Sequence, residues 1–130
     1  MILVDTDICI EILRGNNSVI EEREKCDENI AISFMTVGEL YYGAEKSQNR
    51  IKNIGIVDEF ILSVIVINTD LEILKKFGEL KFILYKNDLL LPDADILIAS
   101  TALTKCSKLI TGNTKHFNHF ENLVQENWRH

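Results

Sequence analysis

Short apolar runs alternate along this chain with longer stretches that have helical spacing. The apolar runs are continuous, which is typical of strands buried on both faces of a sheet. We predict four such strands and a fifth, weaker one, at Ile2–Val4, Ile30–Phe34, Val64–Ile67, Leu109–Ile110 and Leu123–Val124.

Helical patterns fill the segments between these strands. They are expected over about Ile8–Leu13, Ser18–Glu28, Thr36–Ala44, Arg50–Leu62, Thr69–Leu84 and Pro92–Cys106. Thr69-x-x-Glu72 is typical of a capping box, and Asp70 within it is interpreted as a capping residue. Alternating strands and helices indicate an α/β fold with a parallel sheet covered by helices on both faces.

Length and composition favour a single domain over residues 1–130 with an ordinary globular core. The net charge of −6 disfavours non-specific nucleic-acid binding, because affinity for phosphates normally comes from Lys and Arg. A protein of this charge that acts on nucleic acid needs a bound metal and a local strip of basic residues.

Cysteine usage and hydropathy indicate the compartment. The three cysteines, Cys9, Cys26 and Cys106, are odd in number and form no C-x-x-C pair, and no signal peptide is recognisable. The longest uncharged apolar run, about Phe60–Thr69, is too short to span a bilayer. We therefore expect a cytoplasmic protein with no membrane association.

Three acidic residues lie at positions that an α/β fold brings together. Asp5 ends the first strand, Glu39 lies within a helical stretch, and Asp95 opens the last long helix. Ligands of open parallel sheets bind beyond the carboxyl ends of the strands. Converging carboxylates favour a hard divalent cation, and so metal-assisted phosphodiester hydrolysis is the leading hypothesis.

Each acid also has a purely structural interpretation. Asp5 could cap the helix that follows it, although Asp7 is the better candidate because it directly precedes Ile8–Leu13. Glu39 could be a solvated residue, and Asp95 could complement the helix dipole. Gly43, one turn after Glu39, is costly within a helix and suggests close approach of a backbone or a ligand.

The segment after the fourth strand offers small hydrogen-bonding side chains at another strand end. Thr111 and Asn113 are the candidates, with a plain Gly-Asn turn as the alternative. The pair His116-x-x-His119 has weak metal-ligand spacing, and we interpret both as ordinary surface residues.

Four motifs in order resemble those of the PIN domain family, and most closely its VapC-type toxin ribonucleases. They are Met1–Asp7, Thr36–Gly43, Pro92–Leu103 and Leu109–Phe117, and together they extend over essentially the whole chain. The resemblance implies a three-layer α/β/α domain whose five-stranded parallel sheet has the order 3-2-1-4-5. It also implies an endoribonuclease that depends on Mg²⁺ or Mn²⁺.

The resemblance maps the family's first three acidic positions onto Asp5, Glu39 and Asp95. The fourth position, often Asp, is Asn113 here. Because an amide carries no charge, Asn113 would hold a metal-bound water or a phosphate oxygen, and Asp93 is a candidate substitute ligand. Thr111 would position a neighbouring ligand or water. Hydrolysis in this family implies 5′-phosphate and 3′-hydroxyl products.

The expected partners are an RNA substrate, a second copy of the chain and a small antitoxin of the VapB type. Single-stranded or loop RNA is favoured because its bases are unstacked. Lys46, Arg50, Arg14 and Lys115 are candidates for contacts with RNA phosphates. Two alternatives stay open: a housekeeping PIN nuclease of ribosomal RNA processing, and a degenerate PIN domain that binds RNA or protein without cleavage.

Overall fold

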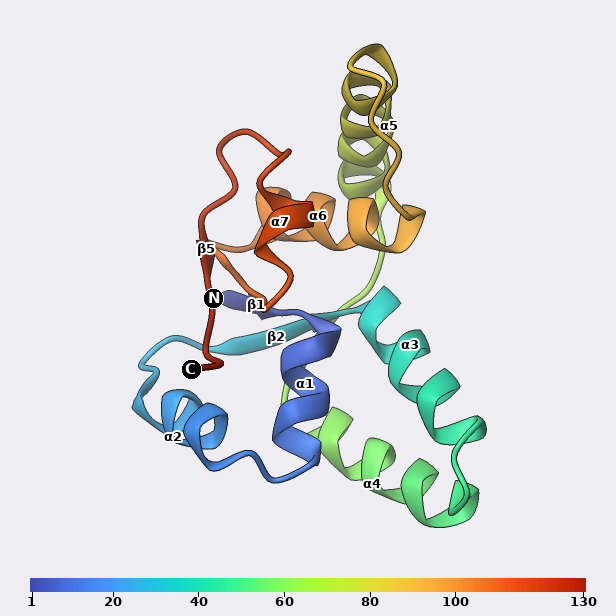
Figure 1. Cartoon of the computed structure of the whole chain (residues 1–130), viewed down its shortest axis with the longest axis vertical. Coiled ribbons are helices and arrows are strands. Elements are labelled where there is room, and N and C mark those ends of the chain that lie inside the picture. The colour runs from blue at the N-terminus through green and yellow to red at the C-terminus, as the bar shows by residue number, and fades with distance from the viewer.

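Five parallel strands form the central layer of the protein in the computed structural model, which describes residues 1–130 (Figure 1). Their spatial order is β3-β2-β1-β4-β5, as predicted. The strands are β1 (Ile2–Val4), β2 (Ile30–Ser33), β3 (Ile65–Ile67), β4 (Leu109–Ile110) and β5 (Gln125–Glu126).

The continuous apolar runs are explained by burial of the central strands on both faces. Every residue of β1 is buried, and Leu3 lies opposite Ala31 of β2 and Leu109 of β4. Ile2 and Val4 join one hydrophobic cluster, whereas Leu3 joins the other. Successive side chains therefore point into two separate cores, one on each side of the sheet.

Seven helices form the two outer layers (Figure 1). One layer contains α1 (Thr6–Leu13), α2 (Asn17–Lys25), α3 (Phe34–Glu45) and α4 (Arg50–Leu62); the other contains α5 (Leu71–Lys86), α6 (Asp93–Lys105) and α7 (Thr114–Phe117). None of these helices combines the length and the apolar character that a bilayer crossing requires.

The fifth strand lies two residues beyond the predicted position. The backbone N–H of Leu109 donates to the carbonyl of Val124, and that of Thr111 donates to Glu126. The prediction of Leu123–Val124 was wrong because it relied on apolar character, and Leu123 instead packs against the core beneath α6 and α7. At the edge of the sheet, the polar pair Gln125-Glu126 forms the backbone pairing with β4.

Two helix starts also differ from the predictions. Asp5, not Asp7, caps α1: its Oδ1 accepts the Thr6 N–H at 2.8 Å, and the helix begins at Thr6. In α5, Asp70 is the cap, as interpreted, because its Oδ1 accepts the Ile73 N–H at 2.9 Å. The predicted Thr69 capping box was wrong, since Asp70 and not Thr69 occupies the N-cap position.

Candidate active site

Asp5 is the central residue of the candidate site, at the carboxyl end of the middle strand. It is only 6 % exposed, and its two carboxylate oxygens have different partners. Oδ1 accepts the N–H of Thr6 at 2.8 Å, and Oδ2 accepts the hydroxyl of Thr111 at 2.7 Å. Asp5 thus caps α1 and at the same time contacts the end of β4.

Thr111 connects Asp5 to the segment that follows β4. Its hydroxyl donates to Asp5 and accepts the backbone N–H of Asn113 at 3.0 Å. The Thr111 side chain is fully buried and its hydroxyl has both a donor and an acceptor partner, which fixes its orientation. The Thr111 hydroxyl is thus held against the Asp5 carboxylate, and its role in positioning a ligand or a water stays a prediction.

Glu39 is held by Thr6, whose hydroxyl also contacts Thr36. Its Oε1 accepts the hydroxyl of Thr6 at 2.7 Å, and Thr6 also shares a 2.9 Å hydrogen bond with Thr36. Ser33 caps α3 and sets the first turn of this helix, since its Oγ accepts the N–H groups of Met35 and Thr36. Glu39 is therefore linked to Asp5 through Thr6, the residue directly after it.

Asp95 reaches the site from the first turn of α6, and its contact is a histidine. Its Oδ2 lies 2.8 Å from Nδ1 of His116, and the same ring nitrogen lies 2.8 Å from Nδ2 of Asn113. A single ring nitrogen either donates to Asp95 or accepts from Asn113, depending on its tautomer. His116, Asn113 and Thr111 thus form a continuous polar connection between Asp95 and Asp5.

Asp7 adds a further carboxylate to this end of the sheet. Its Oδ2 accepts the backbone N–H of Gly112 at 2.9 Å, which ties the segment after β4 to α1. The same oxygen lies 3.5 Å from Nη2 of Arg129, a residue that follows β5. Arg129 is the one cation that contacts an Asp of this cluster directly.

Burial and negative charge together raise the pKa of Asp5 from its ordinary value to about 7. Desolvation is the largest cause, followed by repulsion from Asp7, with Asp95 contributing further. The hydrogen bonds from Thr111 and Thr6 act in the opposite direction and are not sufficient to cancel it. In the protein alone, the charged form of Asp5 is therefore poorly compensated.

The donor set suits a hard divalent cation, although the structure places no three acidic, histidine or cysteine side chains close enough to enclose one. Carboxylate oxygens are the ligands that Mg²⁺ and Mn²⁺ prefer. Mg²⁺ commonly binds through one or two carboxylates and retains several waters. The uncompensated charge around Asp5 fits such a sparsely ligated ion.

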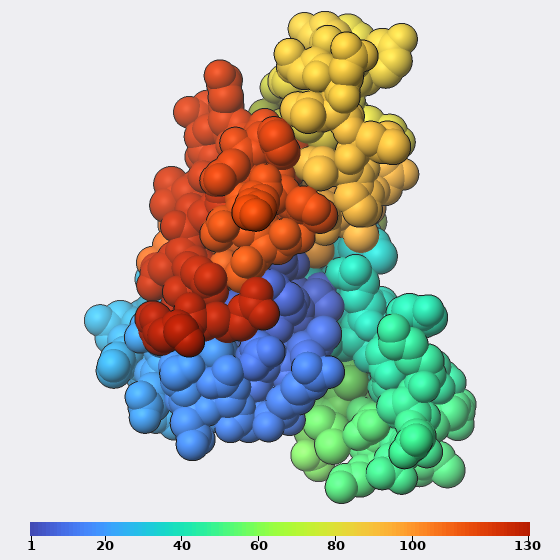
Figure 2. Space-filling view, viewed as in Figure 1, coloured from blue at the N-terminus to red at the C-terminus, as the bar shows by residue number.

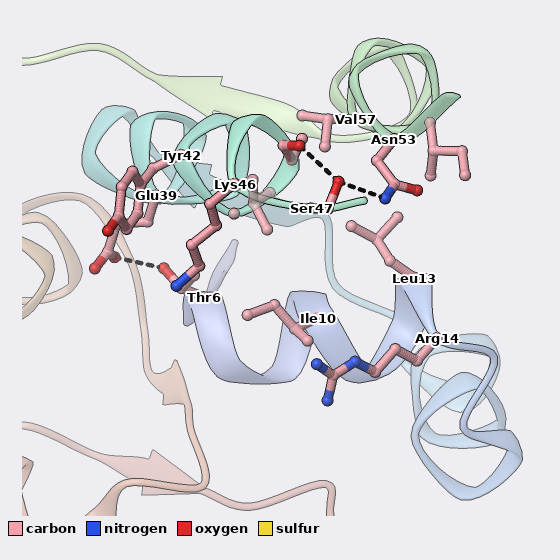
Figure 3. Close-up of a pocket in the computed structure, with 14 residues that line it drawn as sticks. Thr6, Ile10, Leu13, Arg14, Glu39, Tyr42, Lys46, Ser47, Asn53 and Val57 are labelled. Carbon is pink, nitrogen blue, oxygen red and sulfur yellow. Dashed lines mark hydrogen bonds between the residues drawn. The ribbon is translucent and has the colours of Figure 1, made fainter. Parts of the chain in front are cut away.

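A cleft of about 580 Å³ extends from the Glu39 side of the site between α1, α3 and α4 (Figure 3). Thr6 and Glu39 line one end, and Lys46 just after α3 and Arg14 just after α1 line the facing walls. Gly43 also lines the cleft, and a Cβ there would meet no atom within 4 Å. No backbone approaches Gly43 closely, so the backbone alternative was wrong, whereas close approach of a ligand from the cleft stays a prediction.

Three other predicted residues lie outside the hydrogen-bonded network. Asp93 is exposed and forms an ion pair with Lys81 at 2.8 Å. Arg50 pairs with Glu45 at the start of α4, and Lys115 is exposed on α7. The structure thus places Lys46 and Arg14 on the cleft, and Arg50 and Lys115 elsewhere.

Sequence reasoning missed three contributors to the site. His116 was interpreted as a surface residue, yet it contacts Asp95, whereas His119 is indeed exposed. The spacing of three residues from Asn113, one helical turn, was the available signal for His116. Asp7 was interpreted only as a cap, and Arg129 had no signal, because its contact depends on the path of the chain after β5.

A parallel α/β sheet with carboxylates at the carboxyl ends of its central strands defines the class, an open α/β domain whose candidate site lies where such sheets bind ligands. The profile of the PIN domain family matches residues 2–123 of this chain. The chain belongs to the PIN domain family, and within it to the VapC ribonucleases, as the following relatives show.

Ribonuclease VapC2 of Rickettsia felis is 33 % identical over 129 residues, which cover 97 % of this chain and 96 % of that protein. The tRNA(fMet)-specific endonuclease VapC of Shigella flexneri is 28 % identical with the same coverage. Among solved structures, VapBC2 of Rickettsia felis bound to a promoter DNA fragment superposes with a TM-score of 0.92 at 32 % identity, covering 99 % of this chain and 100 % of that one.

Proposed function

We propose that this protein is a metal-dependent endoribonuclease, the toxin of a VapBC-type module, and that Mg²⁺ or Mn²⁺ binds beside Asp5 and Asp95. One observation carries the proposal: a buried carboxylate at the end of the central strand, with two further Asp side chains raising its pKa. Such a site stabilises a bound cation, because the ion removes the repulsion that the carboxylates otherwise experience.

Asp5 and Asp95 are the proposed direct ligands, and Glu39 would accept hydrogen bonds from metal-bound water. When bound, the ion would lower the pKa of a coordinated water and polarise the scissile phosphate. Thr6 and Thr111 hold the carboxylates of Glu39 and Asp5 in fixed orientations through 2.7 Å hydrogen bonds. Because these side chains are already oriented, the site does not need to reorganise during the reaction.

Asn113 and His116 complete the site on the Asp95 side. The Asn113 amide lies within hydrogen-bond distance of His116, and it is the neutral group at the fourth position of the motif. It would orient a water or a phosphate oxygen. Hydrolysis joins the water oxygen to phosphorus and breaks the bond to O3′, which takes up a proton, leaving a 5′-phosphate and a 3′-hydroxyl.

The proposed substrate is a structured RNA with an unpaired loop, and transfer RNA is the first candidate. The relative from Shigella flexneri carries the name of a tRNA(fMet)-specific endonuclease. On this chain, Lys46 and Arg14 face the cleft that leads to Glu39 (Figure 3). Positive charge along that path would offset the net charge of −6 where the RNA backbone passes.

Two protein partners belong to the proposal. The similar structures from Rickettsia felis and Salmonella typhimurium are of VapBC assemblies, which supports a cognate VapB-type antitoxin for this chain. A second copy of the chain is the other partner. On α5, Phe82 and Tyr85 are exposed and stack on each other, which gives this helix an apolar face without a cover.

The decisive experiment is cleavage of initiator tRNA and total RNA by antitoxin-free protein, with Mn²⁺, with Mg²⁺ and with EDTA. We expect cleavage that requires a divalent ion and is lost in Asp5→Asn and Asp95→Asn proteins that remain folded by circular dichroism. Asp93→Asn is the matched control, because Asp93 is exposed and paired with Lys81. It tests at the same time whether Asp93 acts as a ligand, in which case it would behave like Asp95→Asn.

The opposite results have distinct meanings. Cleavage in EDTA, or by Asp95→Asn protein at the parental rate, would overturn the assignment of the site. Binding of Mn²⁺ and tRNA without cleavage would instead identify a PIN domain that holds RNA without cutting it. Growth arrest on expression separates a toxin from a housekeeping nuclease.

A further inference from the structure

The last residues of the chain cross the molecule and lie on its N-terminal part, as the dark red segment over blue in Figure 2 shows. Two contacts fix this segment to the rest of the molecule, at Trp128 and His130, and one hydrogen bond shapes it internally. Trp128 is 3 % exposed and belongs to the core cluster that contains Val4 and Ile8. Asn127 Oδ1 accepts the backbone N–H of Arg129 at 2.9 Å, and His130 lies 3.3 Å from Glu22.

This anchoring places the Arg129 side chain against the backbone of the candidate site. Its guanidinium lies over Gly112, where a Cβ would overlap it, so the glycine is what admits the side chain. Gly112 is the residue between Thr111 and Asn113, which connect to Asp5 and to the Asp95–His116 pair. Arg129 therefore contacts the residue whose two chain neighbours, Thr111 and Asn113, belong to the Asp5 side and the Asp95 side of the site.

The contacts of the guanidinium leave most of its donors free. Its single ion pair is with Asp7 at 3.5 Å, and its side chain is 42 % exposed. A guanidinium has five N–H donors in a planar fork that matches two oxygens of a phosphate. Full neutralisation of Asp7 would favour a shorter, two-pronged contact, which this pair does not form.

We propose that Arg129 is a catalytic residue that binds the scissile phosphate of the RNA and stabilises the negative charge that develops on it. The inference rests on the proposed function, because the phosphate is that of the RNA substrate. The anchors at Trp128 and Asn127 supply the rigidity that such a contact needs, and Gly112 supplies the space. Arg129 brings a positive group into direct contact with the acidic cluster, through its ion pair with Asp7.

Single-turnover cleavage of initiator tRNA by Arg129→Gln, Arg129→Lys and wild-type protein tests the proposal. We expect the single-turnover rate constant for cleavage to fall about 100-fold in Arg129→Gln and less in Arg129→Lys, which keeps the charge but not the fork. Arg23→Gln is the matched control, since Arg23 contacts Ser63 and Phe60 on another part of the molecule. It should cleave at the parental rate.

A double variant separates contact with phosphate from simple neutralisation of Asp7. If Arg129 only compensates Asp7, the Asp7→Asn/Arg129→Gln protein should recover the activity of Asp7→Asn alone, and the proposal is overturned. If Arg129 binds phosphate, the double variant stays as impaired as the product of the two single effects. Added guanidinium ion should then partly restore an Arg129→Ala protein, but not Arg129→Gln, whose amide fills the space.

Binding in EDTA distinguishes failure of this inference from failure of the proposed function. A plot of log affinity for tRNA against log salt concentration has a negative slope. We expect the magnitude of this slope to be smaller by about one in Arg129→Gln, as for one lost phosphate contact. An unchanged slope together with unchanged cleavage overturns the role of Arg129 and leaves the nuclease intact. A changed slope in a protein that cleaves no RNA supports the phosphate contact and overturns the nuclease.

Discussion

Asp5 combines two tasks, since it caps α1 and is also a buried carboxylate repelled by Asp7 and Asp95. The capping bond to Thr6 stabilises the charged form, but burial and the neighbouring Asp7 outweigh it. The protein therefore holds a carboxylate whose charge is unfavourable until a cation compensates it. This is how a site can favour binding of a metal at some cost to the stability of the metal-free fold.

The raised pKa of Asp5 predicts a pH dependence of stability in EDTA. Above about pH 7 both folded and unfolded states carry the charge, and the folded state bears the cost of burying it. As the pH falls from about 7 towards 3.8, only the folded state takes up a proton, so stability rises. We expect this one group to add about 2 to 3 kcal/mol to the free energy of unfolding at about pH 5 relative to about pH 8.

Urea unfolding of wild-type and Asp5→Asn proteins across this pH range measures the effect. Asparagine is of similar size and carries no charge, so the variant should show a flatter profile. The two proteins are compared by the slopes of their profiles, because Asn offers one acceptor oxygen where Asp5 accepts bonds from both Thr6 and Thr111. Parallel profiles for the two proteins would show that Asp5 keeps an ordinary pKa. Added Mg²⁺ should flatten the wild-type profile at high pH, since it would bind the ionised form.

Lys46 and Arg50 provide a second comparison at the level of single residues. Lys46 lines the cleft near the Tyr42 ring, whereas Arg50 is paired with Glu45. We expect Lys46→Gln to reduce the salt slope of tRNA binding by about one, and Arg50→Gln to change it less, since part of its charge is already compensated. Fluorescence anisotropy at several salt concentrations measures both, and equal losses would place the RNA over α4 as well.

At the level of elements, the start of α5 offers two candidate caps, Asp70 and Thr69. Asp70 accepts the Ile73 N–H and also pairs with Lys105 at 2.6 Å, which lowers the pKa of Asp70 below its ordinary value. We expect Asp70→Ala to lower Tm by a few degrees, and Asp70→Asn, which can still cap, to lower it less. Thr69→Ala should have little effect, and a loss equal to that of Asp70→Ala would restore the capping box.

The elements that could be predicted from the sequence alone are those with a strong hydrophobic pattern. Strands β1, β2 and β4 are buried on both faces, so their runs of branched residues identify them within about one residue. The edge strand β5 lacks such a run, because one side faces solvent and its polar residues pair through the backbone alone. The position of β5 is determined by its backbone pairing with β4, which the sequence alone does not reveal.

The candidate site divides in the same way. Asp5, Thr111 and Asp95 were predictable, because each directly ends a strand or opens a helix whose position the pattern defines. His116 and Arg129 were not, because their contacts depend on the short helix α7 and on a segment that crosses the molecule after β5. Long-range contacts of irregular segments leave no periodicity in the sequence.

Among the apolar residues that the folded molecule leaves exposed, several gather on one helix, α5. Along α5, Phe82 is 56 % exposed and Tyr85 is 76 % exposed, with ring centroids 6.5 Å apart. Leu71 and Leu74 extend the same helix with further exposed apolar area. A patch of this kind on a small protein favours a protein contact, and a symmetric dimer is the simplest arrangement that would bury it on both copies.

We therefore expect the purified protein to be a dimer by light scattering, and Phe82→Glu to shift it to the monomer while the far-ultraviolet circular dichroism stays unchanged. A charge placed in a desolvated apolar contact costs far more than one left in water, so a single substitution should suffice. Ile51→Glu is the matched control, because Ile51 is 82 % exposed on α4, in the other helical layer. If Ile51→Glu breaks the dimer and Phe82→Glu does not, the contact lies on the α4 side, next to the cleft that carries Lys46. The two copies would then restrict access of RNA to that cleft, whereas a dimer through α5 leaves both clefts open, and the two active sites could work independently.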